Sequence, residues 1–288
     1  MPPAGNVVTL RTEPTAVDAP FPATAETAVA RHAREGTVHV DRDAVAVEEP
    51  LELRIEGKSI AVLMRTPGHD EELVAGFLLT EGLITSRADV FEINRCPAVT
   101  GEPSRNVIDV LLARPDPAQL ERLTRHVFSS SSCGICGKAT IASVHLQFAP
   151  LATPAPQVSV AVLRTAPEKL LRRQDSFRTT GGLHAAALLA ADGEPEVVRE
   201  DVGRHNAVDK VLGRMLLDDR LPASALTLFV SGRVSFEIVQ KALAARIAVI
   251  AAVSAPTSLA VDFARASGQT LVGFVRDGRM NVYSGAVE

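Results

Sequence analysis

Two cysteines stand two residues apart in a chain of 288 residues that contains three cysteines in all. Cys133 and Cys136 form a Cys-x-x-Cys motif, and four serines, residues 129–132, come directly before it. Thiols at this spacing bind a metal, cycle through a disulfide, or present one reactive sulfur. The nearby glycines allow a sharp turn, and Lys138 adds a positive charge that stabilises a thiolate. We therefore favour a reactive cysteine over one that only packs.

A metal site is less well supported by the residue types. Structural zinc takes four ligands, usually from two such pairs, and the third cysteine, Cys96, stands alone. A zinc deaminase needs His-x-Glu followed by Pro-Cys-x-x-Cys. His69 and Glu71 match the first half, but Ser132 occupies the position of the proline. We predict no metal site and keep a zinc-dependent, deaminase-like enzyme as an alternative.

Composition narrows the class of protein. Hydrophobic residues make up 46 % of the chain, enough for a substantial core, and the net charge is −4. No basic field is therefore expected to hold nucleic acid or an anionic membrane. The sequence contains no run of about 18 apolar residues, so we predict no membrane span. An odd number of cysteines argues against a disulfide framework and for a reducing, cytoplasmic location.

The first 128 residues divide into a tail and a small unit. Residues 1–36 carry scattered prolines, which predicts a disordered tail in which only 26–35 fit a short helix. Residues 37–128 contain alternating strand patterns, a hairpin turn at Glu56 and a helix that begins at Asp70. This second stretch predicts a small α+β domain.

A loop and linker, residues 129–156, lead to the last part of the chain, residues 157–288. There, apolar strands alternate with amphipathic helices. Such alternation predicts a mainly parallel sheet with an antiparallel edge, covered by helices on both faces. We therefore predict a three-layer α/β/α domain.

Polar motifs gather where strands of this domain end. One motif ends in His184, and another, residues 200–206, contains His205. They predict either a polar pocket or ordinary surface residues, and for the two histidines both interpretations stay open. For Asn206 we favour a helix N-cap, with Asp209 completing a box-like cap.

Three further turns in this domain suit a phosphate ligand. Residues 231–233 and 254–258 each follow a strand and precede a helix, where ligands bind in open α/β sheets, although ordinary N-caps explain them equally well. The third turn places two arginines and an aromatic ring around a tight bend, and its residues are Phe274, Val275, Arg276, Asp277, Gly278 and Arg279.

Taken together, these motifs resemble the FdhD family of formate dehydrogenase accessory sulfurtransferases, over about residues 45–288. The motifs that carry the resemblance occur in the family's order, at residues 49–51, 65–68, 132–138, 180–184, 200–210, 231–233, 252–256 and 273–276. Several long motifs in the correct order make the resemblance specific.

The resemblance implies a sulfurtransferase. The family takes sulfur from a cysteine desulfurase and delivers it to the Mo-bis(molybdopterin guanine dinucleotide) cofactor before that cofactor enters formate dehydrogenase. It implies a persulfide on Cys133 with Cys136 assisting, and cofactor binding by residues 274–279. It also implies a homodimer and a cytidine-deaminase-like fold for the second domain. A non-catalytic chaperone of the cofactor is a further alternative.

Overall fold

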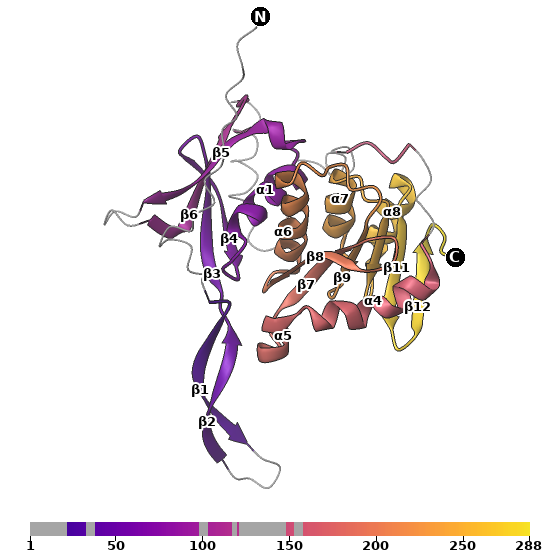
Figure 1. Ribbon diagram of the computed structural model, residues 1–288, viewed down its shortest axis with the longest axis horizontal. Helices are drawn as coiled ribbons and strands as arrows, with labels where there is room; N and C mark the ends of the chain where they lie inside the picture. The colour runs from indigo at the N-terminus through magenta and orange to yellow at the C-terminus, as the bar shows by residue number, and fades with distance from the viewer. Residues whose placement is uncertain (1–21, 33–37, 98–102, 117–119, 121–147, 153–157) are drawn as a thin grey trace, which may run out of the picture.

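The computed structural model describes residues 22–32, 38–97, 103–116, 120, 148–152 and 158–288. Within these ranges the chain forms sheets of two, four and six strands (Figure 1). Cys133 and Cys136 lie outside the described residues.

The small N-terminal unit is a four-stranded sheet backed by a helix. Its strand order is β4-β3-β6-β5. The elements are β3 (Glu49–Ile55), β4 (Lys58–Arg65), α1 (Asp70–Thr80), a short 3-10 helix (Arg87–Asp89), β5 (Val90–Pro97) and β6 (Pro103–Leu112). Glu56 and Gly57 both have positive φ, as a tight hairpin turn between β3 and β4 requires. Alternate residues of β3 are fully buried, so one face of the sheet packs on the core.

The larger unit is a six-stranded sheet of order β12-β11-β10-β9-β7-β8. Its strands are β7 (His184–Leu189), β8 (Pro195–Asp201), β9 (Thr227–Val230), β10 (Val249–Ala252), β11 (Thr270–Arg276) and β12 (Arg279–Ser284). Only β9, β10 and β11 are mutually parallel. The predicted antiparallel edge is present at β12. The sheet is less parallel than predicted, because β7 pairs antiparallel with β9 and a hairpin joins β7 to β8 at the other edge.

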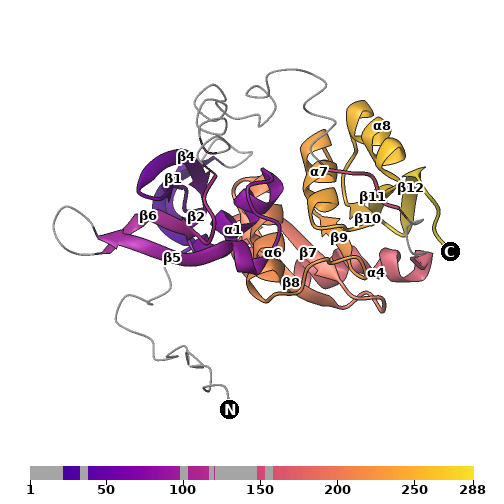
Figure 2. The ribbon, with the colours of Figure 1, turned by 90° about the horizontal axis from the view of Figure 1, so that it is seen from above.

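Helices cover both faces of the large sheet (Figures 1 and 2). One face carries α6 (Arg204–Leu217), α7 (Phe236–Ala244) and α8 (Ser258–Ser267), and the other carries α4 (Val160–Arg172) and α5 (Asp175–Thr180). Successive strand residues enter different cores: Leu228 packs with the first set of helices, and Phe229 packs with the second. This confirms three α/β/α layers. No helix in the described ranges is long and apolar enough to cross a membrane. The cytidine-deaminase likeness and the domain boundaries stay predictions.

A two-stranded arm projects from the body (Figure 1). It consists of β1 (Thr24–His32) and β2 (Val38–Ala46), paired antiparallel along their length. The short helix predicted over residues 26–35 was wrong, and part of the predicted disordered tail forms a strand. The sequence of β1 has no apolar face of its own, so its strand structure depends on backbone pairing with β2.

The two units meet where α1 packs against α6. A Cβ atom at Gly76 would overlap the carbonyl of Asp209, and one at Gly213 would overlap the carbonyl of Glu72. The two helices therefore touch through their backbones, and only glycine allows this approach.

Candidate ligand-binding site at the sheet edge

The motifs at residues 65–68 and 200–210 first serve the junction between the units. Asp201 and Lys210 form a fully buried ion pair with 2.7 Å between Nζ and Oδ2. Lys210 also donates to the carbonyl of Thr66 at 2.9 Å, and the Thr66 N–H donates to Asp201. Because these bonds join β4, β8 and α6, the motif residues hold the two units in one orientation.

The N-cap predicted at Asn206 was wrong. Gly203 caps α6 without a side-chain bond, and Asn206 lies inside the helix. Its amide donates to the carbonyl of Met64 at 2.8 Å and to Asp201 at 3.0 Å. Asp209 completes no cap, because it pairs with Lys241 at 2.8 Å. The local pattern assigned the side chains of Asn206 and Asp209 to the start of a helix, but both bind residues that are distant in the sequence.

Two more buried pairs extend this junction. Arg65 pairs with Asp70 at 2.9 Å within the small unit, and Arg199 of β8 binds Glu72 of α1 through two bonds. Burial raises the pKa of the Glu72 carboxyl, but hydrogen bonds from Arg199 and His69 outweigh it and lower that pKa to about 2. We call the buried pairs Arg65–Asp70, Glu72–Arg199, Asp201–Lys210 and Asp209–Lys241 the junction ion pairs.

The carboxyl ends of β9 and β10 meet at one edge of the large sheet, beside the start of antiparallel β7. The turns that follow β9 and β10 lie side by side: the Val234 N–H donates to the carbonyl of Ala255 at 3.1 Å, and the Thr257 N–H donates to the carbonyl of Val234 at 2.9 Å. Thr257 also caps α8. This is the edge at which open α/β sheets bind ligands.

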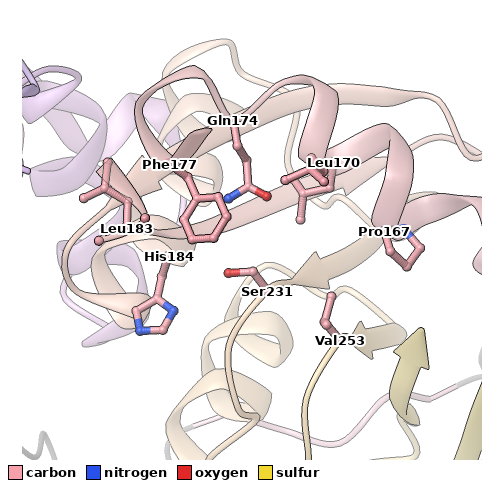
Figure 3. A pocket seen from close by; sticks show the side chains of 11 residues that line it. Pro167, Leu170, Gln174, Phe177, Leu183, His184, Ser231 and Val253 are labelled. Carbon is pink, nitrogen blue, oxygen red and sulfur yellow. The ribbon is translucent and has the colours of Figure 1, made fainter. Parts of the chain in front are cut away.

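A cavity of about 500 Å³ opens at this edge, between the sheet and helices α4 and α5 (Figure 3). Its walls are mainly carbon. The lining residues are Pro167, Leu170, Leu171, Gln174, Phe177, Gly181, Gly182, Leu183, His184, Ser231 and Val253. The volume lies within the range of about 300–1,000 Å³ that is typical of small-molecule sites.

Two arginines and one histidine gather next to the cavity. His184 lines it, and a Cβ at Gly232 would lie 3.3 Å from Nδ1 of His184 and 3.5 Å from Cβ of Arg204. Burial, and then the charges of Arg204, His205 and Arg233, lower the pKa of His184. Arg204 Nε is buried and has no hydrogen-bond partner among the described residues. We call His184, Arg204 and Arg233 the cationic rim.

His205 belongs to a different arrangement. Its Nε2 lies 3.1 Å from the hydroxyl of Ser235 and 3.0 Å from the carboxylate of Glu237. Both partners face the same ring nitrogen, so the three residues cannot relay a proton as a catalytic triad does. Burial raises the pKa of Glu237, but its bond and attraction to His205 lower it further, to about 2.

The segment predicted to bind cofactor, residues 274–279, lies one strand beyond the cavity. The Phe274 N–H donates to the carbonyl of Ser254 at 3.1 Å, and Val253 beside Ser254 lines the cavity. Phe274 has a φ of 54°, rare for an aromatic residue. The guanidinium of Arg276 lies over its ring at 5.5 Å, and Arg279 is exposed.

The sequence did not point to the outer wall of the cavity. Gln174 and Phe177 come from α5 and the residue before it, a region with no recognisable motif. Glu200 holds this wall in place, because its carboxylate accepts from the N–H groups of Ser176 at 3.0 Å and Phe177 at 2.7 Å. A glutamate in a strand motif thus caps a helix on another part of the chain.

Comparison with known proteins identifies the family. A profile of the FdhD/NarQ family matches residues 46–288. The chain belongs to this family. It is 51 % identical over 259 residues to the sulfur carrier protein FdhD of Mycolicibacterium paratuberculosis, covering 88 % of this chain and 95 % of that protein. It is 50 % identical over 257 residues to the sulfur carrier protein FdhD of Streptomyces coelicolor, covering 88 % and 91 %.

A solved structure has the same fold. The crystal structure of a protein from Desulfotalea psychrophila, assigned as a formate dehydrogenase accessory protein, superposes with a TM-score of 0.71 at 27 % identity. The match covers 92 % of this chain and 98 % of the other. The β1–β2 arm lies almost wholly before residue 46, where the FdhD/NarQ profile begins.

Proposed function

We propose that this FdhD/NarQ-family protein is a sulfur carrier that serves formate dehydrogenase. It takes sulfur from a cysteine desulfurase onto Cys133 and passes it to the Mo-bis(molybdopterin guanine dinucleotide) cofactor, its substrate, before the cofactor enters the enzyme. The observation that carries the proposal is the identity of about half of all aligned residues to relatives named sulfur carrier proteins.

The loading step is a thiol–persulfide exchange. The thiolate of Cys133 attacks the outer sulfur of the desulfurase persulfide, and a new S–S bond forms as the old one breaks. The desulfurase cysteine leaves as a thiolate, and the proton of the persulfide stays on the transferred sulfur. No net oxidation occurs, so no further reactant is needed.

Cys136 is suited to the release step. Attack of its thiolate on the inner sulfur of the Cys133 persulfide forms a disulfide between the two cysteines and expels the outer sulfur as HS⁻. The two thiols supply the two electrons that reduce this sulfur to sulfide. A cellular thiol reductant then reopens the disulfide.

The sheet edge supplies features that suit the cofactor. Its dinucleotide arms combine flat rings with diphosphates, and the site combines an apolar cavity with the cationic rim. Arg276 and Arg279 add two exposed guanidinium groups, whose planar geometry matches phosphate oxygens. We propose that residues 274–279 bind an arm of the cofactor, with the Phe274 ring available to a base on the face away from Arg276.

Mass spectrometry tests the carrier step. After incubation with a cysteine desulfurase and cysteine, the protein should gain one sulfur atom, located by peptide mapping on Cys133. Cys133→Ser should abolish both this gain and sulfur transfer, whereas Cys136→Ser should load sulfur and release it slowly. Cys96→Ser is the matched control and should load normally. Sulfur found only on Cys96 or Cys136 contradicts the assignment.

A cell-based assay separates the carrier from a chaperone. If the protein only holds the cofactor, cells that carry Cys133→Ser will still mature active formate dehydrogenase. Loss of formate dehydrogenase activity, with normal levels of the variant protein, supports sulfur transfer.

The arginine segment and the partners are tested separately. Replacing Arg276 and Arg279 with alanine should weaken the binding of GDP, a fragment of the cofactor, in calorimetry. Unchanged affinity removes the segment from the site. We also propose that the protein acts in the cytoplasm as a homodimer, which light scattering of the full chain checks.

A further inference from the structure

The helix α7 ends at a residue type that is unusual for its backbone conformation. Arg246 follows the C-cap residue of α7 and has a φ of 61°, in the left-handed region. Its N–H donates to the carbonyl of Leu243, and the N–H of Ile247 donates to the carbonyl of Ala242, as in a Schellman motif. Glycine is usual at this position, because other side chains are strained there. The helix α8 follows that rule and ends at Gly268, which has a φ of 74°.

The side chain of Arg246 binds a distant part of the chain. Its Nη1 donates to the carbonyl of Ala149 at 2.7 Å, and its Nη2 donates to the carbonyl of Pro150 at 3.2 Å. One guanidinium group therefore joins two consecutive carbonyl groups. The rigid fork of donors in arginine allows this geometry, whereas the single ammonium group of lysine does not reproduce it.

The segment that Arg246 binds is held by further contacts. The Leu151 N–H donates to the carbonyl of Ser267, the last residue of α8, at 2.9 Å. The side chains of Phe148 and Leu151 pack against the main core cluster. We call residues 148–151 the anchor segment. It lies at the edge of the large sheet where β10 and β11 begin, because Arg246 and Ser267 stand just before these strands.

The anchor segment follows the stretch that contains the predicted carrier cysteines. Cys133 precedes Phe148 by 15 positions, and the sequence predicts loop and linker between them. After Ala152, the next described residue is Val158, 25 positions after Cys133, and its carbonyl accepts from the Glu288 N–H at 3.1 Å. Holding the anchor segment therefore shortens the linker on this side of Cys133. The effective concentration of a linked group falls with about the −3/2 power of linker length, so the shorter linker raises it about twofold.

We propose that Arg246 is a positioning residue for sulfur delivery, because it holds the anchor segment and thereby keeps Cys133 within short reach of its acceptor. The contact also explains why an arginine stands where glycine is usual, since its two bonds to carbonyl groups offset the strain of the backbone. Arg246 acts through the chain and takes no part in the chemistry. The inference rests on the proposed function, in which Cys133 carries the sulfur.

Arg246→Gly tests this role, because glycine suits the left-handed conformation and removes only the side-chain contact. Its melting temperature should stay close to that of the unmodified protein. Hydrogen exchange of the peptide that contains Leu151, followed by mass spectrometry, should become at least about tenfold faster, since the anchor segment is released. Loading of Cys133 by a cysteine desulfurase should be normal. Formate dehydrogenase activity should fall about twofold or more in cells that make limiting, equal amounts of the protein.

Two further variants serve as controls. Arg265 of α8 donates from Nε and Nη2 to the carbonyl of Tyr283, at 3.3 and 3.1 Å, which is a contact of the same kind outside the anchor segment. Arg265→Met should leave both the exchange at Leu151 and the formate dehydrogenase activity unchanged. Arg246→Lys should restore part of the activity, because an ammonium group reaches one of the two carbonyl groups.

Three outcomes overturn the proposal: unchanged exchange at Leu151 in Arg246→Gly, full formate dehydrogenase activity of that variant at limiting amounts, or an equal loss of activity in Arg265→Met. Reduced loading of Cys133 together with a lower melting temperature in Arg246→Gly would also overturn it, by showing a structural role only. If the unmodified protein gains no sulfur on Cys133, the proposed function fails instead, and the exchange measurement still reports on the anchor segment.

Discussion

The junction ion pairs and the cationic rim are both clusters of charge, but they are built in opposite ways. At the junction, each buried cation faces a carboxylate, as Lys210 faces Asp201 at 2.7 Å. At the sheet edge, Arg204 has a buried Nε without a partner in the described part of the chain, and the positive charges of Arg204 and Arg233 help to lower the pKa of His184 between them. The fold satisfies one cluster, whereas in the other it leaves the Arg204 Nε without a partner among the described residues.

Because of this difference, residues of one motif have different roles in the two clusters. The stretch from 200 to 210 serves both clusters, because Asp201 and Lys210 lock the junction while Arg204 points to the edge. Removing one partner of a buried pair strands a charge, whereas removing a charge that has no partner relieves repulsion. Stability should therefore depend on the junction and ligand affinity on the edge.

The largest expected effect is on stability at the junction. Lys210→Met leaves the Asp201 carboxylate buried without its cation and should lower the free energy of unfolding by about 3–5 kcal/mol. Urea unfolding measures it. Arg233→Met, an exposed cation of the rim, is the control and should change stability by less than about 0.5 kcal/mol. Equal losses in the two variants would show that the two clusters do not differ as described.

The pH dependence of stability provides the second comparison. The pKa of Glu72 falls from 4.5 to about 2 on folding. The ionised carboxylate therefore contributes stability that is complete above about pH 4.5 and is lost as the pH falls toward 2. At about 1.4 kcal/mol for each pKa unit, the contribution is about 3 kcal/mol.

Glu72→Gln should remove this part of the pH dependence. Urea unfolding at pH 6 and pH 3 should show a smaller loss for the variant than for the unmodified protein. If both lose the same stability over this interval, Glu72 is not held as an ion pair with Arg199.

At the sheet edge, we expect the opposite of the junction: a substitution should reduce ligand affinity and not stability. Arg204→Met should weaken pyrophosphate binding about tenfold, the effect of losing one charge-assisted bond. Its free energy of unfolding should stay the same or rise, because the Nε group was buried without a partner. A variant that keeps its pyrophosphate affinity but loses stability would place Arg204 with the junction instead.

The smallest expected effect is the titration of His184. Burial, together with Arg204, His205 and Arg233, lowers its pKa below the usual 6.5, and Asp201 opposes this shift. NMR of the labelled histidines should show this ring losing its proton at a lower pH than exposed histidines. Adding pyrophosphate should raise the pKa of His184, since an anion stabilises the charged ring. No rise on saturation would place the anion elsewhere.

Local pattern predicted most elements of the large unit. The face of α6 that contains Val208, Val211 and Leu212 is buried as its spacing predicts, and the Asp277-Gly278 turn joins β11 to β12. Prediction from the local pattern failed where contacts with a distant segment determine the structure. The strand β1 has no hydrophobic periodicity, and only its partner β2 makes it a strand.

The candidate site was predictable only on its sheet side. The motifs that contain His184 and residues 231–233 stand at strand ends, where topology gathers ligand contacts. Gln174 and Phe177 were missed because they follow α4 without a motif, and Glu200 reaches across to fix them. The predicted carrier residues, Cys133 and Cys136, lie outside the described part of the chain, so their roles stay predictions.

The sequence by itself determined the family, the alternation of strands and helices, and the cysteine pair as the candidate for chemistry. Such features depend on residue types and short spacings. The tertiary structure decided which charges are paired. Asn206, Asp209 and Arg204 stand within six positions on one helix, and only contacts with β4 and α1 assign the first two to the junction. Charge pairing depends on distances between remote segments, and these exist only once the chain has folded.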